Sequence, residues 1–170
     1  MTQMHKKAMT QMHKMGVPQG YHSLTPYITV KDVAQSIDFY RRALGAEERM
    51  RLATPDGKRI IHGEVAIGDS VVMLGEENAE RGCVAPSGLK GHSAGLYLYV
   101  PDVDAAFTQA KGAGAKVTMP VTDMFWGDRV AEIEDPSGHR WSIATRKEDL
   151  SPKEISERAK AWFASQGKSA

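Results

Sequence analysis

Hydrophobic and polar positions alternate near the start of the chain and then change to a helical period. Every second residue from Leu24 to Val30 is apolar, which predicts a strand. Asp32 follows as a helix N-cap, with Gln35 three residues later, and Gly45 favours helix termination. Between them, apolar residues recur at helical spacing: Val33, Ile37, Tyr40 and Leu44. The pattern predicts a strand, a tight turn and a helix.

The same succession of patterns returns in the second half of the chain. Residues 96–100 alternate, and a helical stripe runs from Val103 to Ala110. Further strands are predicted at residues 60–67 and 70–74 in the first half, and at residues 129–133 and 140–145 in the second. Tyr27 and Tyr97, Asp32 and Asp102, and Gly68 and Gly138 share one offset of 70 residues. This regularity predicts an internal duplication.

Segments without periodicity divide the chain. We expect residues 1–20 to be a disordered leader, although its repeated Met and His residues could also form a metal-binding tail. Residues 21–148 are expected to form one domain, with modules at 21–78 and 94–148 and a linker at 79–93. Within residues 149–170, Ser151, Pro152 and Glu154 predict the start of a C-terminal helix. Its apolar stripe is expected to pack on the domain or on a second subunit.

Composition argues against nucleic-acid binding, a membrane span and an internal disulfide. The chain has 170 residues and a formal net charge of +1, which gives no electrostatic reason to expect nucleic acid or an anionic membrane as partner. No apolar run approaches the roughly 20 residues that a membrane span needs. Cys83 is the single cysteine, which excludes an internal disulfide, and we expect a cytoplasmic protein.

Three motifs resemble one family. Residues 27–33 followed by Ser36-Ile37-Asp38-Phe39-Tyr40 are similar to the first strand and helix of glyoxalase-like proteins, the vicinal-oxygen-chelate superfamily. Asp135-Pro136-Ser137-Gly138-His139 resembles the last turn of that fold, and residues 124–129 resemble the PhnB-like subgroup. The resemblance implies an α+β fold of two tandem βαβββ modules that form a cupped half-barrel, here with a C-terminal helix. It also implies a homodimer.

The metal-ligand positions of that family carry unsuitable residues in this chain. Carried over by motif, the two first-strand positions fall on Thr25 and Gly95. The last-strand positions fall on Ser142 and on Val72 or Met73. These side chains are poor ligands for a divalent ion. We therefore expect no metal and no cofactor.

A relocated site is the alternative. His62 and Glu64 lie two residues apart on a predicted strand and therefore share a face, and the offset aligns them with Glu132 and Glu134. His62, Glu64 and Glu132 could act as acid and base, or hold a metal. They could equally form an outward polar face paired with Arg59 and Arg129.

Aromatic and polar residues are expected to line the cup. Strand alternation predicts that Leu24, Ile28, Val30, Leu96, Leu98 and Val100 face the helices. The ligand-binding residues would then be Thr25, Tyr27, Tyr97, Tyr99, Phe125, Trp126, Arg129 and Ser142, with Arg129 as a cation for an anionic ligand. Ordinary core packing is the other interpretation of the tyrosines.

Two hypotheses of function follow. In the first, the protein binds an aromatic or drug-like small molecule in the cup without a metal, as bleomycin-resistance proteins do. In the second, it is a lyase-like or transferase-like enzyme whose site lies around His62, Glu64 and Glu132.

Overall fold

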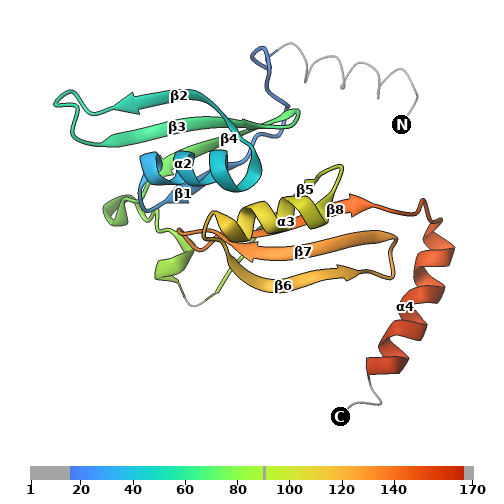
Figure 1. Cartoon of the computed structure of the whole chain (residues 1–170). Helices are drawn as coiled ribbons and strands as arrows, with labels where there is room; N and C mark the ends of the chain where they lie inside the picture. Colours follow the sequence, from blue (N-terminus) through green and yellow to red (C-terminus); the bar gives the residue numbers. More distant parts are fainter. Residues whose placement is uncertain (1–15, 90, 167–170) are drawn as a thin grey trace, which may run out of the picture. The chain divides into compact units, whose positions relative to one another are not determined.

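The computed structural model describes residues 16–89 and 91–166, which fall into two compact units (Figure 1). Unit 1 extends to Ala85 and unit 2 begins at Pro86. Among the described residues, no helix is long and apolar enough to cross a membrane.

Unit 1 is a βαβββ module. It consists of β1 (Tyr27–Val30), α2 (Val33–Leu44), β2 (Glu47–Ala53), β3 (Ile60–Ile67) and β4 (Ser70–Glu76), followed by the short 3₁₀ helix η1 (Ala79–Arg81). The sheet order is β1-β4-β3-β2, with β1 parallel to β4 and the other pairs antiparallel. The helix α2 crosses between β1 and β2 and packs mainly on β3.

The sequence signals for α2 act as predicted. The Asp32 side chain accepts a hydrogen bond from the Gln35 backbone N–H, and Gly45 ends the helix with a φ of 65°. Val33, Ile37 and Tyr40 are fully buried and form the core between helix and sheet. Gly63 allows this close packing, because a Cβ there would lie 2.7 Å from Ile37 Cδ1.

Unit 2 repeats the topology. After η2 (Pro86–Gly88) come β5 (Gly95–Tyr99), α3 (Val103–Gly112), β6 (Lys116–Asp123), β7 (Asp128–Glu134) and β8 (Arg140–Arg146), in the sheet order β5-β8-β7-β6. The helix α4 (Pro152–Gln166) follows, and Ser151 and Glu154 form the predicted capping box at its start. The α+β fold of two βαβββ modules with a C-terminal helix is thus confirmed.

The Asp-Pro-Ser-Gly turn between β7 and β8 is built around Asp135. This buried carboxylate accepts hydrogen bonds from the backbone N–H groups of Ser137 and His139 and from the Trp141 indole. Gly138 has a φ of 90°, and a Cβ there would lie 2.5 Å from the Ser87 backbone nitrogen. The motif therefore joins the turn to η2.

One expected orientation is wrong. Leu24 was expected to face a helix, but its side chain is 86% exposed. The strand β1 begins only at Tyr27, so the alternation at residues 24–26 precedes the sheet and has no helix to cover it.

Candidate ligand-binding site

The sheet of unit 1 has one helix-covered face and one helix-free face. Gly63 of β3 contacts α2, so its neighbours His62 and Glu64 lie on the opposite face. The strand register places Tyr27 next to Met73 and Met73 next to Glu64. Tyr27 is 64% exposed on this helix-free face.

The sheet of unit 2 has the same arrangement. The Thr145 hydroxyl accepts a hydrogen bond from the backbone N–H of Val103 at the start of α3, so Thr145 lies on the helix-covered face. Its neighbours Ala144 and Arg146 therefore lie on the helix-free face. There the register aligns Tyr97 with Ser142 and Tyr99 with Ala144.

Asp128, the first residue of β7, collects hydrogen bonds on this face. Its carboxylate is only 2% exposed. It accepts hydrogen bonds from the hydroxyls of Tyr97 (3.1 Å) and Tyr99 (2.9 Å) and from Arg146 Nε (2.6 Å). The Arg146 guanidinium lies 5.9 Å from the centre of the Tyr99 ring. The four side chains form one cluster, the Asp128 cluster.

Burial and hydrogen bonding within the Asp128 cluster shift the pKa values of Asp128 and Tyr97. Burial raises the pKa of Asp128, but hydrogen bonds from Tyr99, Tyr97 and Arg146 outweigh it, so this pKa lies below its ordinary value. Burial, together with the hydrogen bond to Asp128, raises the pKa of Tyr97 to about 12. Near neutral pH the Asp128 carboxylate is therefore ionised. The Tyr97 hydroxyl stays protonated and donates a hydrogen bond to it.

Both tyrosine rings remain accessible although their hydroxyls are anchored. Tyr97 is 46% and Tyr99 54% exposed, and their ring centres lie 5.1 Å apart. The Trp126 side chain lies beside the Tyr97 hydroxyl and opposes the rise of its pKa. The result is a rigid aromatic surface with a cation beside it.

Phe125 and Trp126 connect this surface to α4. Their rings meet edge to face at 4.9 Å. Phe125 also contacts Trp162 and Phe163 of α4, at centroid distances of 5.6 Å and 6.3 Å. The apolar stripe of α4 thus packs in part on the loop that carries Trp126.

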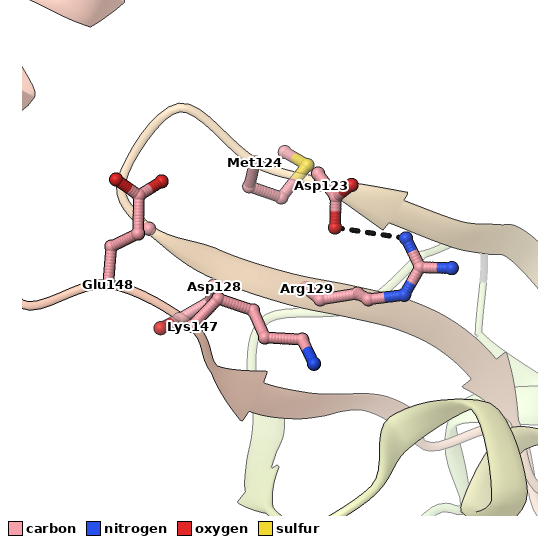
Figure 2. A pocket seen from close by; sticks show the side chains of 7 residues that line it. Asp123, Met124, Asp128, Arg129, Lys147 and Glu148 are labelled. Carbon is pink, nitrogen blue, oxygen red and sulfur yellow. Dashed lines mark hydrogen bonds and ion pairs between the residues drawn. The ribbon is translucent and has the colours of Figure 1, made fainter.

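Arg129 does not reach the tyrosines. It lies on the helix-covered side, where it forms ion pairs with Asp104 of α3 and with Asp123, each at 2.9 Å. Figure 2 shows its guanidinium turned toward Asp123. Both side chains line an open pocket of about 440 Å³. The cation next to the tyrosines is instead Arg146, which pairs with buried Asp128 and with exposed Asp149 and which sequence analysis did not single out.

The helix-free face of unit 1 carries a second cluster, around Glu64. This carboxylate is 6% exposed. It accepts a short hydrogen bond from the Tyr21 hydroxyl, and its Oε1 lies 3.5 Å from His62 Nε2. The His62 ring meets Tyr27 edge to face at 5.6 Å. Arg59 is not part of this cluster, because it forms an ion pair with Glu76.

The strand register changes one alignment between the modules. The row Tyr27, Met73, Glu64 in unit 1 corresponds to Tyr97, Ser142, Glu132 in unit 2. Glu132 is therefore the counterpart of Glu64 and not of His62, because Tyr97 and Glu132 are 35 residues apart whereas Tyr27 and Glu64 are 37 apart. Glu132 is paired with Arg140, and Glu134 with Lys116.

Comparison with known proteins shows to which family this fold belongs. The model of the Glyoxalase/Bleomycin resistance protein/Dioxygenase superfamily matches residues 20–143. The chain belongs to this superfamily. Uncharacterized proteins of Mycobacterium tuberculosis and Mycobacterium bovis are 38% identical to it over 149 residues, which cover 85% of this chain and 84% and 94% of theirs.

Several solved structures share the fold. TioX from Micromonospora sp. ML1 is 25% identical with a TM-score of 0.58, over 72% of this chain and 97% of that chain. The fosfomycin resistance protein FosX from Listeria monocytogenes, whose structure contains Mn(II) and sulfate, is 14% identical with a TM-score of 0.56, over 77% and 93%. The likeness to FosX shows the fold alone.

The donor atoms of this chain do not fit a divalent metal at the superfamily's usual ligand positions. The register makes Met73 the counterpart of Ser142, and Gly95 has no side chain. The Thr25 hydroxyl donates to the His22 carbonyl. A thioether and two hydroxyls are poor partners for a hard divalent ion. Within residues 16–89 and 91–166, no group of three or more His, Cys, Asp or Glu residues is arranged to hold a metal.

Proposed function

We propose that the protein binds a planar aromatic small molecule, without a metal, on the helix-free face of unit 2. The observation that carries this proposal is the pair of half-exposed tyrosine rings whose hydroxyls are anchored to buried Asp128. Because the rings are already fixed, a ligand that stacks on them costs little side-chain entropy. An aromatic surface of this kind with a few polar groups is typical of small-molecule sites.

The charges of the face favour a ligand with an electron-rich or anionic group. Arg146 is 48% exposed at its side chain and remains accessible beside Tyr99. Its partner Asp128 is buried, and its second partner Asp149 is 97% exposed, where an ion pair is weak, so an anionic group of a ligand can compete for the guanidinium. Ser142, next to Tyr97, offers a hydroxyl to the same ligand.

Tryptophan fluorescence tests the proposal. A panel of planar aromatic compounds is titrated into the protein while emission is recorded. Trp126→Phe identifies the reporting residue, because the Trp126 side chain lies beside the Tyr97 hydroxyl. Tyr99→Ala should weaken a bound compound about tenfold, because ring stacking contributes about 1.4 kcal/mol. Tyr99→Phe keeps the ring and should retain most of the affinity. Binding that is unaffected by Tyr99→Ala contradicts the proposal.

Acid–base catalysis at the Glu64 cluster is the second candidate. Buried Glu64 beside His62 favours it, since a carboxylate can orient an imidazole for proton transfer. Glu132, the third residue of this hypothesis, is paired with Arg140 in unit 2. If compounds from the panel are converted, His62→Ala should abolish turnover and Tyr99→Ala should affect binding only. Turnover that persists in His62→Ala removes this candidate.

A further inference from the structure

The Glu64 cluster contains a side chain that belongs to neither the sheet nor the helix of unit 1. Tyr21 comes from residues 16–26, which precede β1 and contain no helix or strand. Its hydroxyl donates to Glu64, which lies 43 residues further along the chain. A buried carboxylate needs such a donor, because leaving it without partners is costly. The donor is supplied here by a segment from outside the sheet.

The end of this segment is held on β4, where the Pro26 carbonyl accepts a hydrogen bond from the Met73 backbone N–H, whereas Tyr21 is held by Arg49 and Glu64. The Arg49 guanidinium lies 4.6 Å from the centre of the Tyr21 ring, and Arg49 Nη1 donates to the Gly20 carbonyl at 3.4 Å. The side chains that follow, from His22 to Leu24, are exposed. Tyr21 is therefore attached mainly by its own ring and hydroxyl, in the way that a small ligand would be.

The surroundings of Tyr21 select a definite chemical group. The Glu64 carboxylate accepts a hydrogen bond and repels anions, so it favours a neutral hydroxyl donor. Arg49 over the ring favours an electron-rich aromatic system. His62 lies 3.5 Å from the other carboxylate oxygen and helps to hold Glu64 in position. A neutral phenol meets all three conditions.

We propose that the place occupied by the Tyr21 side chain is a second ligand subsite, specific for a neutral phenolic hydroxyl, and that Tyr21 fills it as an internal ligand. An external phenol binds there by displacing the Tyr21 side chain. The tethered tyrosine competes at an effective concentration of about 1 mM or more, so it weakens external binding without blocking it. The proposal extends the proposed function to unit 1 and does not depend on the Asp128 cluster.

The test uses p-cresol, which has the same structure as the tyrosine side chain. Chemical shifts of His62 and Glu64 are followed by NMR while p-cresol is added to the full chain and to its Tyr21→Ala variant. Tyr21→Ala should bind p-cresol at least about tenfold more tightly than the unchanged protein, because the internal competitor is gone. Toluene lacks the hydroxyl and 4-methylbenzoate carries a negative charge, so both should bind much more weakly.

A second variant keeps every side chain of the subsite. Gly20 has a φ of 81°, and a Cβ there would lie 3.3 Å from Arg49 Nη2, so Gly20→Ala should loosen the segment while Tyr21, His62 and Glu64 stay unchanged. Its affinity for p-cresol should lie between those of the unchanged protein and Tyr21→Ala. This variant decides the matter if Tyr21→Ala fails to fold.

Two results would overturn the inference. One is equal p-cresol affinity in all three proteins, and the other is toluene binding as tight as p-cresol binding. Neither result affects the proposal for unit 2, which is read from Trp126 fluorescence and Tyr99→Ala. If no aromatic compound changes the Trp126 fluorescence but p-cresol still binds to Tyr21→Ala, the proposed site in unit 2 is contradicted and the Tyr21 subsite is supported.

Discussion

Asp128 determines how the aromatic surface of unit 2 is presented. Three donors converge on its carboxylate, two of them tyrosine hydroxyls. The same hydrogen bonds therefore serve stability and ligand binding, because they compensate the buried charge of Asp128 and also fix the two tyrosine rings. Removal of the carboxylate should therefore lower stability and loosen the rings together.

Asp128→Asn tests this directly. The amide cannot accept all three hydrogen bonds as a carboxylate does, so the free energy of unfolding should fall by about 3 kcal/mol in urea denaturation at pH 7. Asp149→Asn is the matched control: Asp149 also pairs with Arg146 but is 97% exposed, so the change should stay within about 0.5 kcal/mol. Equal losses in the two variants would show that the cluster has no special role.

The same carboxylate predicts a pH dependence. The pKa of Asp128 is lowered in the folded protein, so its stabilisation is complete above the ordinary aspartate pKa of about 4 and disappears as the pH falls through the lower folded value. The stability difference between the unchanged protein and Asp128→Asn should shrink as the pH falls below about 4. Urea denaturation at several pH values measures this, and a constant difference would contradict it.

Individual residues show where sequence reasoning works and where it stops. Tyr27, Tyr97 and Tyr99 could be placed on the helix-free faces because strand alternation is local. Asp128 and Arg146 could not be linked to them, since the hydrogen-bond partners lie between 18 and 47 residues apart and depend on strand register. Arg129 was chosen for its nearness to Trp126 in sequence, but it points to the helix side.

The packing of α2 on β3 depends on one small residue. Gly63 lies where a Cβ would be 2.7 Å from Ile37 Cδ1 and 2.8 Å from Val33 Cγ1. Gly63→Ala should force the helix from the sheet and cost about 1–3 kcal/mol in thermal or urea unfolding. Gly112→Ala, with nothing within 4 Å, should be neutral or stabilising by up to about 1 kcal/mol. A neutral Gly63→Ala would contradict the described packing.

The attachment of α4 depends on Phe125 and on the ion pair of Arg158 with Glu148. Phe125→Ala should free the helix, so backbone amides of α4 should exchange hydrogen faster while those of β7 and β8 keep their protection. Leu89→Ala, at a 56% exposed position, should leave exchange in α4 unchanged. Unchanged exchange in Phe125→Ala would show that other contacts hold the helix.

Helices and strands differed in how well they could be predicted. The helices α2 and α4 have capping residues and apolar stripes, so their starts followed from the sequence. The strands β2 and β6 gave no clear signal, because β2 is exposed throughout and β6 is exposed at all but two of its positions. Periodicity reveals a strand only where one of its faces is buried.

Across the whole chain, the duplication was visible but its register was not. A single offset aligned the first strands and the starts of the helices correctly, whereas by strand register the chain from β5 to β7 is two residues shorter than the chain from β1 to β3, which shifts the later strands. The expected homodimer, the cytoplasmic location and the PhnB-like subgroup stay predictions. Light scattering at several concentrations tests the first, with twice the mass of the 18.6 kDa chain as the expected result and a monomer as the contradiction.

Calorimetric titration of an aromatic ligand tests the central claim most directly. The best compound from the fluorescence panel is titrated into protein dialysed against chelator, into the same protein resupplied with Mn(II) or Zn(II), and into Tyr99→Ala. We predict equal affinity with and without metal, and about tenfold weaker binding to Tyr99→Ala. Binding that requires the added metal, or that Tyr99→Ala leaves unchanged, would contradict metal-independent recognition by the aromatic face of unit 2.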